Sequence, residues 1–361
     1  MKFRQFSPIA AFLVAGIAAS PAAPCTRTLY VGADDLVITG RNMDWVEDMA
    51  SDLWIFPAGI ERNGASDRDP ITWTSTYGSV IVSGYNIGTT DGMNERGLVA
   101  NLLYLTESEY ASPVAGRPNL SIAAWAQYVL DNFATVAEAV DALRAEPFNL
   151  LAPTLPNGSA AALHLSISDA SGDSAIFEYI DGALVIHHGK AYSVMTNSPP
   201  FEQQLAVDAY WSDVGGLNFL PGTGRAADRF ARASFLLGAI PRAVDPAYIA
   251  SVPEGSYAFQ AVASVMSVQR AVSVPLGIST PDQPNLSSTI WRTVSDQTNR
   301  VYYFDSSTRP NTFWVSFADV DFSVGAPVRK LTIQHGEVFA GETADDFAPA
   351  EPFAFLPAKA G

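Results

Sequence analysis

The chain has 361 residues, a formal net charge of −16 and a single cysteine. The acidic balance disfavours nucleic acid and anionic membrane surfaces as partners, because both would repel the protein. One cysteine cannot form an internal disulfide, although a chain of this length can bury a large core without one.

The first 24 residues have the pattern of a secretory leader. Lys2 and Arg4 give a positive start, an apolar run covers residues 9–19, and small residues and prolines follow. The run is too short to span a bilayer. We therefore expect residues 1–24 to be removed and residues 25–361 to form one domain. The mature protein is expected to be periplasmic or secreted, without membrane insertion; an uncleaved N-terminal anchor is the alternative.

Cys25 lies where the leader should end, directly after Pro24. Cleavage there would leave a thiol and a free α-amine on one residue, which can supply both a nucleophile and its base. A buried inert thiol and a lipid-modified cysteine are the alternatives. Pro24 is unusual before a signal-peptidase site, so cleavage after Ala23 followed by loss of Pro24 stays open.

Two strands, residues 26–31 and 36–44, are expected to form a hairpin around a turn at residues 32–35. In such a hairpin, facing residue numbers sum to about 67, which puts Cys25 opposite Asn42 unless a bulge shifts the register by one. Arg41 and Asp44 then lie within one or two residues of Cys25. Local geometry alone thus brings a cation and a carboxylate beside the new N-terminus.

The remaining elements alternate between groups of strands and groups of helices. Further strands are expected at residues 54–59, 71–76, 80–84, 97–106, 163–168, 175–180, 183–188, 192–196, 290–295, 300–305, 312–317 and 329–334. Helices are expected after Ser121 to residue 130, from Thr135 to residue 145, and over residues 200–210, 226–240 and 257–270. This order predicts an α+β fold with antiparallel sheets packed between helices.

Metal and phosphate motifs are missing from the sequence. None of the four histidines, His164, His187, His188 and His335, has zinc-ligand spacing. There is also no Gly-rich phosphate loop and no G-x-S-x-G elbow. We expect neither a metal nor an organic cofactor. A papain-like Cys–His pair is disfavoured, because Cys25 would lie on a strand and not at a helix start, where its pKa would be lowered.

Several stretches, in order along nearly the whole mature chain, resemble the choloylglycine hydrolase family. That family includes penicillin V acylases and conjugated bile acid hydrolases. The matching stretches are Cys25 and residues 40–45, 91–98, 195–199 and 229–230. The resemblance implies a four-layer αββα sandwich of the N-terminal-nucleophile hydrolases. The leader resembles the exported Gram-negative branch, whose members can also deacylate N-acyl homoserine lactones.

The resemblance also implies a role for each candidate site residue. The implied roles are Cys25 as nucleophile, Arg41 as the guanidinium beside it, Asp44 as the carboxylate that holds the α-amine, Asn197 as side-chain oxyanion donor, Tyr104 as backbone oxyanion donor, Arg229 as second arginine, and Trp45 and Met43 as substrate-binding residues. Tyrosine at the position of Tyr104 is common in penicillin-active members, whereas bile-salt-active members usually have asparagine.

Each of these residues also has a plainer interpretation. Asp44 would simply pair with Arg41, Arg41 would be a surface strand residue, and Arg229 would be a solvated helix charge. Asn197 would serve only as a turn or cap residue. Trp45 and Met43 would then belong to the core.

The expected function is hydrolysis of an amide C–N bond, in penicillin V or an N-acyl homoserine lactone, through an acyl-enzyme. The alternatives are a conjugated bile acid hydrolase and a catalytically inactive secreted binding protein of the same fold. The expected partner is a small-molecule amide substrate. The resemblance further implies a homo-oligomer, a tetramer, with residues 211–221 as a candidate assembly loop.

Overall fold

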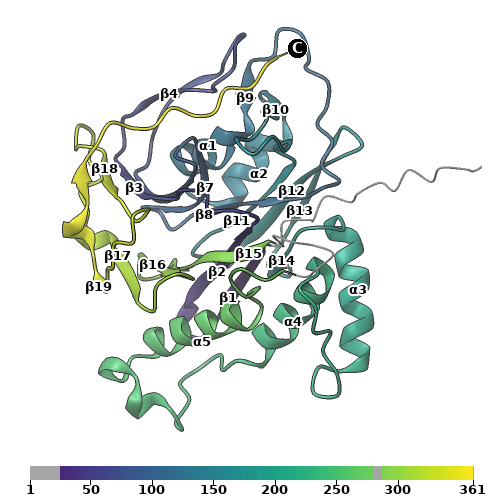
Figure 1. Ribbon diagram of the computed structural model, residues 1–361, viewed down its shortest axis with the longest axis vertical. Helices are drawn as coiled ribbons and strands as arrows, with labels where there is room; N and C mark the ends of the chain where they lie inside the picture. Colours follow the sequence, from purple (N-terminus) through teal and green to yellow (C-terminus); the bar gives the residue numbers. More distant parts are fainter. Residues whose placement is uncertain (1–24, 280–286, 361) are drawn as a thin grey trace, which may run out of the picture.

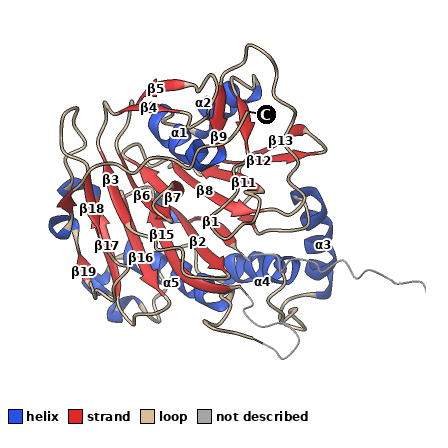
Figure 2. Ribbon diagram, turned by 45° about the horizontal axis from the view of Figure 1, so that its top comes forward, coloured by secondary structure: helices blue, strands red, loops and turns tan. Residues whose placement is uncertain are grey.

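Two large β-sheets lie face to face between layers of helices in the computed structural model of the chain (Figures 1 and 2). The structure describes residues 25–279 and 287–360, so the expected leader lies outside the described residues. The layers follow the order helix, sheet, sheet, helix. This confirms the expected αββα architecture.

The seven-stranded sheet carries the start of the described chain. In spatial order its strands are β14 (Val194–Met195), β1 (Thr26–Val31), β2 (Val37–Trp45), β15 (Ser288–Asp296), β16 (Val301–Ser306), β17 (Thr312–Ser316) and β19 (Gly341–Glu342). Neighbours are antiparallel except β17 and β19. Every residue of β2 is buried, because the other sheet covers one face of this strand and a helix covers the other.

The nine-stranded sheet is antiparallel throughout. In spatial order its strands are β13 (Ala183–His188), β12 (Ser174–Ile180), β11 (Leu163–Ser168), β8 (Val99–Tyr104), β7 (Gly88–Asn94), β6 (Ser79–Gly84), β3 (Leu53–Phe56), β18 (Arg329–Leu331) and β20 (Ala348–Pro349). Two small sheets pair β9 (Asn119–Ser121) with β10 (Asn149–Leu151) and β4 (Glu61–Asn63) with β5 (Thr72–Thr74).

The outer layers contain the five α-helices of the described residues (Figure 1). They are α1 (Trp125–Asn132), α2 (Val136–Arg144), α3 (Phe201–Val214), α4 (Ala226–Ala239) and α5 (Tyr257–Ala271). The first two cover the nine-stranded sheet, α4 and α5 cover the seven-stranded sheet, and α3 packs against α4. Thr135 starts α2 as expected and forms a capping box with Glu138. Ser121 was expected to cap the helix that runs to residue 130, but it caps a short 3-10 turn, Ile122–Ala124, ahead of α1.

Two apolar cores hold the layers together. One includes the space between the sheets and contains Met43 from the seven-stranded sheet and Val80 and Leu103 from the nine-stranded sheet. The other lies between the nine-stranded sheet and helices α1 and α2, around the buried ring of Trp125. Burying a side chain of this size contributes about 1.5–3 kcal/mol, so the packed faces account for much of the fold's stability.

The register of β1 against β2 differs by one residue from the expected register. Thr26 lies opposite Asn42, so facing numbers sum to 68, and Cys25 comes level with Met43. The loop between the strands spans residues 32–36, one residue longer than the expected turn. The expected position of Cys25 opposite Asn42 was therefore wrong, although Arg41 and Asp44 still flank it.

Strand β7 was not expected, and the expected strand 97–106 is confined to β8. Glycines and polar residues interrupt the apolar alternation of β7. Gly92 is required there, because a Cβ atom would lie 2.6 Å from Ile81 and 2.9 Å from Leu130 on α1. The other expected elements differ mainly at their ends; β14 is shorter and α3 extends to Val214.

Candidate active site

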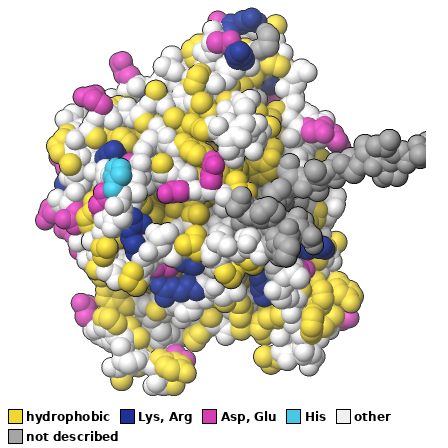
Figure 3. All heavy atoms as spheres, in the orientation of Figure 1, with side chains coloured by type: hydrophobic (Ala, Val, Ile, Leu, Met, Phe, Trp, Pro, Cys, Tyr) yellow, Lys and Arg dark blue, Asp and Glu magenta, His cyan; other side chains and the backbone are white. Residues whose placement is uncertain are grey.

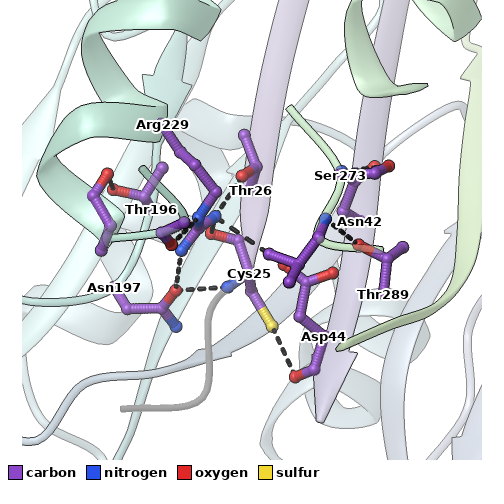
Figure 4. A network of polar contacts seen from close by, with 12 residues as sticks. Cys25, Thr26, Asn42, Asp44, Thr196, Asn197, Arg229, Ser273 and Thr289 are labelled. Atoms are coloured by element: carbon purple, nitrogen blue, oxygen red, sulfur yellow. Dashed lines mark hydrogen bonds and ion pairs between the residues drawn. The ribbon is translucent and has the colours of Figure 1, made fainter. Parts of the chain in front are cut away.

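The start of β1 places Cys25 beside the end of β2 (Figure 4). Side chains alternate along a strand, so the Cys25 thiol shares a face with Arg41 and Met43, toward the other sheet. Asp44 points instead toward the helix layer. Cys25 Sγ lies 3.9 Å from Met43 Sδ and 3.7 Å from the main-chain oxygen of Asp44.

Burial governs the protonation of the Cys25 thiol. The residue is 2% exposed, and burial raises the pKa of the thiol while the Arg41 guanidinium opposes that rise. In the described part of the chain, the polar contacts of the sulfur are with Met43 and Asp44 and with no histidine. This agrees with the expectation that disfavoured a papain-like Cys–His pair, and a base for this thiol has to come from another group.

The nitrogen of Cys25 is the nearest candidate for that base. It donates a hydrogen bond to Asn197 Oδ1. While Pro24 is attached, this nitrogen is an amide, which cannot accept a proton. Cleavage of that peptide bond would convert it to an α-amine, whose pKa of about 8 is close to that of a thiol.

Arg41 is fully buried between the sheets. It donates from Nη2 to the carbonyl oxygen of Leu102, and its guanidinium carbon lies 5.0 Å from the centre of the Trp291 ring. Its Nε lies 3.8 Å from the carboxylate of Asp91 on β7. Asp91 also accepts hydrogen bonds from Asn101 and Tyr302. Arg41 is thus not a surface residue, and it pairs with Asp91 and not with Asp44.

Strand β8 continues beyond the end of its pairing with β7, so backbone groups of its last residues face the site. The ladder between these strands ends at the pair of Asp91 and Asn101, and Leu105 bonds through its N–H on the β11 side. Hydrogen-bonding direction alternates along an antiparallel strand, so the N–H and C=O groups of Leu102 and Tyr104 point away from β11. The two carbonyl oxygens accept from Arg41 and Asn197, and the N–H groups are available to the site.

Asp44 and Arg229 form an ion pair on the helix-facing side. Both are fully buried, with Arg229 Nη1 3.8 Å from the Asp44 carboxylate and 2.5 Å from the carbonyl oxygen of Cys25 (Figure 4). Burial raises the pKa of Asp44 to about 6, opposed by Arg229. Among the described residues, neither Asp44 carboxylate oxygen accepts a hydrogen bond of ordinary length, although the Thr289 hydroxyl also lowers the pKa of this carboxyl. The Asp44 carboxylate can therefore accept a further hydrogen bond from a donor on Cys25.

The side-chain amide of Asn197 is held from three directions. Its oxygen accepts from the Cys25 nitrogen and from Arg229 Nη2 at 3.0 Å, and its nitrogen donates to the Tyr104 carbonyl oxygen at 2.6 Å. The first two partners can only donate and the third can only accept, which fixes the orientation of the amide. One N–H of Asn197 stays available for another acceptor.

An apolar pocket opens beside the Cys25 sulfur. It encloses about 630 Å³ not occupied by protein atoms, part of it open to solvent. Met43, Trp45 and Tyr104 line it together with Leu102, Ile122 and Leu356. The Trp45 ring lies 5.9 Å from the Tyr104 ring, and its Nε1 donates to the hydroxyl oxygen of Tyr85 at 2.8 Å. Shape and lining fit an apolar group that extends from the thiol.

The structure brings the other seven candidate residues together around Cys25, and their roles stay predictions. Arg229 is buried, so it is not a solvated helix charge. Sequence reasoning did not find the partnership of Asp91 with Arg41, although Asp91 lies in the stretch 91–98. The pairing of Arg41 with Asp91 has no local signal in the sequence, because it joins two strands that are distant along the chain.

Two largely antiparallel sheets packed face to face between helical layers are the N-terminal-nucleophile hydrolase fold, and in this chain a thiol is buried at the start of β1. A profile of the linear amide C–N hydrolases, choloylglycine hydrolase family, matches residues 25–329. The chain therefore belongs to the choloylglycine hydrolase family and is a linear amide C–N hydrolase.

The chain is similar to two penicillin V acylases. It is 48% identical over 345 residues to the penicillin V acylase of Pectobacterium atrosepticum, covering 92% of each chain. It is 51% identical to the solved penicillin V acylase from Agrobacterium tumefaciens, with a TM-score of 0.82 over 92% of this chain and 100% of the other. A solved conjugated bile acid hydrolase from Clostridium perfringens shares the fold at 20% identity and a TM-score of 0.70, covering 88% of this chain and 98% of that one.

Among residues 25–279 and 287–360, no helix combines the length and apolar character needed to cross a bilayer.

Proposed function

We propose that the chain, once cut before Cys25, hydrolyses an acyl–nitrogen bond with Cys25 as an N-terminal nucleophile. The observation that carries the proposal is the position of this residue: its sulfur faces an apolar pocket while its nitrogen bonds to Asn197. Cleavage would place a base and a nucleophile on one residue at the mouth of that pocket.

In the first step, the free α-amine accepts the thiol proton and sulfur bonds to the substrate carbonyl carbon. The developing oxyanion accepts hydrogen bonds from the uncommitted N–H of Asn197 and from the backbone N–H of Tyr104. Arg41 favours the thiolate, and the Asp44 carboxylate accepts from the α-amine. Arg229 supports the Asn197 oxygen.

The C–N bond then breaks as the ammonium group returns its proton to the leaving nitrogen, which leaves a thioester on Cys25. Water attacks this thioester and passes a proton to the amine. Release of the carboxylic acid restores the thiol and completes the cycle.

The pocket supports an apolar acyl group, either the phenoxyacetyl group of penicillin V or the chain of an N-acyl homoserine lactone. Tyr104 and the similarity to the two penicillin V acylases favour the first substrate. The apolar lining, which includes Leu163 and Leu356, suits the second. Rates on both, and on a glycine-conjugated bile salt, would rank these substrates.

The test uses the fact that Cys25 is the chain's only cysteine. The active protein should begin at Cys25 by mass spectrometry and take up one equivalent of iodoacetamide, with loss of activity at the same rate. Cys25→Ala should abolish hydrolysis. Full activity in Cys25→Ala, or in a chain that retains residues before Cys25, would overturn the proposal and favour another nucleophile.

We also propose that residues 1–24 direct export and that the mature enzyme is periplasmic or secreted. Deleting residues 2–24 should move the protein from the osmotic-shock fraction to the cytoplasm. An unchanged distribution would contradict an export role for this segment.

We further propose that copies of the chain assemble through the end of α3 and the loop after it. Apolar side chains gather over the lower part of α3 in Figure 3, and Tyr210, Leu217 and Phe219 are 63%, 93% and 56% exposed. Leu217→Asp should lower the molar mass measured by light scattering, whereas Asp141→Asn, at an exposed position of α2, should not. A monomeric parent would exclude assembly.

A further inference from the structure

The turn that carries Asn197 is held by a buried side chain from the helix that follows it. Gln204 lies one turn into α3 and is fully buried. Its Nε2 donates to the carbonyl oxygens of Asn197 and, at 2.6 Å, of Pro199. Its Oε1 accepts from the main-chain nitrogen of Thr196 at 3.3 Å. Three bonds from one amide therefore fix the backbone on both sides of Asn197.

The same amide connects this turn to the helix that carries Arg229. The Thr196 hydroxyl lies 3.0 Å from Gln204 Oε1 and 3.1 Å from the carbonyl oxygen of Ala226, the first residue of α4. Its single hydrogen serves one of these acceptors at a time. Arg229, three residues farther along α4, donates to the Asn197 side chain.

A buried carboxylate fixes the start of α3 itself. Both Glu178 oxygens accept from the Phe201 nitrogen, at 3.2 and 3.0 Å, and one of them lies 3.0 Å from His164 Nδ1. Burial works against the charge of Glu178, but the neighbouring histidines and the Phe201 N–H hold the pKa of this carboxyl near 2. The helix that supplies Gln204 is thus anchored to β12, and its amide has a defined position.

We propose that Gln204 is a positioning residue that sets the Asn197 amide for oxyanion stabilisation. The inference rests on the proposed oxyanion role of Asn197. In α3, Phe201 and Gln204 are the buried residues, so a polar side chain occupies a place where packing alone would favour an apolar one. Oxyanion donors act only when their geometry is fixed in advance, and Gln204 fixes the backbone that aims this donor.

The experiment compares Gln204→Met, which keeps the length but removes the amide, with Gln203→Met, an exposed neighbour on the same helix. Active sites are counted by iodoacetamide titration of Cys25, and rates are expressed per titrated site. Gln204→Met should lower kcat by about 10- to 100-fold with little change in KM, as expected for a misplaced oxyanion donor. Gln203→Met should leave both unchanged.

Gln204→Glu and Gln204→Asn keep the test falsifiable if Gln204→Met does not fold. Glutamate lacks both N–H donors, and its carboxylate would lie beside the carbonyl oxygens of Asn197 and Pro199. The loss of kcat in Gln204→Glu should therefore be larger than that in Gln204→Met. Asparagine keeps the amide on a shorter side chain and should give an intermediate loss. A kcat per site equal to the parent's in these variants would overturn the proposal, as would an equal loss in Gln203→Met.

A double variant separates this proposal from the proposed function. Asn197→Ala should lower kcat by about 100- to 1,000-fold, and adding Gln204→Met to it should cost little more, because the donor that Gln204 positions is gone. If the loss of kcat in the double variant equals the product of the two single losses, Gln204 does not act through Asn197, and the inference would be overturned. Full activity in Asn197→Ala would instead remove the oxyanion role from the proposed function.

Discussion

Buried charge is concentrated at the start of β1. Arg41 and Asp91 lie on one side of Cys25, and Asp44 and Arg229 lie on the other. Buried ion pairs add little net stability, but removing one partner leaves an uncompensated charge in the interior. Charges kept at such cost indicate a functional demand on this region, and both pairs allow a direct test.

The raised pKa of Asp44 predicts a pH-dependent stability of the uncut chain. The folded carboxyl, with a pKa of about 6 against about 4 when unfolded, binds its proton more tightly in the folded state. Its contribution therefore favours folding below pH 4 and is lost as the pH rises through about 6, a difference of roughly 2–3 kcal/mol. Asp44→Asn should reduce the slope of unfolding free energy against pH in urea unfolding between pH 4 and 7, while the raised pKa values of Asp91 and Asp131 maintain the remainder.

The exposed Asp213 provides the matched control, because Asp213→Asn should retain the slope. In the cut chain the free α-amine supplies a donor and a positive charge beside Asp44, so the slope should also be weaker there. Identical slopes in parent and Asp44→Asn would show that this carboxyl keeps an ordinary pKa.

Asp91→Asn should destabilise the protein by about 3–5 kcal/mol, because Arg41 would lose its charge partner inside the sandwich. Urea unfolding of Asp91→Asn, Arg41→Met and the double variant measures the coupling. The double variant should be more stable than the sum of the single effects allows, since no unpaired charge remains. Simple additivity would contradict a coupled pair.

Among the elements, those with strong local signals could be predicted from the sequence. The β1–β2 hairpin, the capped start of α2, and α4 follow from alternation and capping residues. Strand β7 could not be found because glycines interrupt it, and strands of two or three residues have no period to detect. The hairpin brought Arg41 and Asp44 to Cys25, whereas Asn197 and Arg229 came only from the family resemblance. Gln204 had no signal, because its partners are backbone atoms.

The segment of residues 350–360 contains no helix or strand, and it contributes Leu356 to the lining of the pocket. Leu356 donates its N–H to the Ile87 carbonyl oxygen and accepts from Ser121 Oγ, both at 2.7 Å, and its side chain lines the pocket. Leu356→Ala should therefore shift the preference toward longer acyl chains. Each additional buried methylene is worth about 0.8 kcal/mol, or ~4-fold in kcat/KM.

The measurement is kcat/KM over a homologous series of acyl chains. Leu356→Trp should shift the preference the other way, and Lys359→Ala, at an exposed position of the same segment, should not change it. A chain-length profile that is the same in all three variants would exclude Leu356 from acyl selection.

At the scale of the whole molecule, folding and activation are separable. The fold is held by two apolar cores and contains no disulfide, since the chain has one cysteine, so an oxidising compartment is not required for folding. We propose that activity depends instead on a free α-amine at Cys25.

A chain that begins Met-Cys25 and is made in the cytoplasm should be active, because an initiator methionine is removed ahead of a small residue. A chain with Glu inserted between Met and Cys25 should fold with the same urea midpoint and show no hydrolysis. Alkylation would still label its thiol, so loss of the amine would be distinguished from loss of the sulfur. Equal activity of the two chains would mean that the base lies elsewhere in the site.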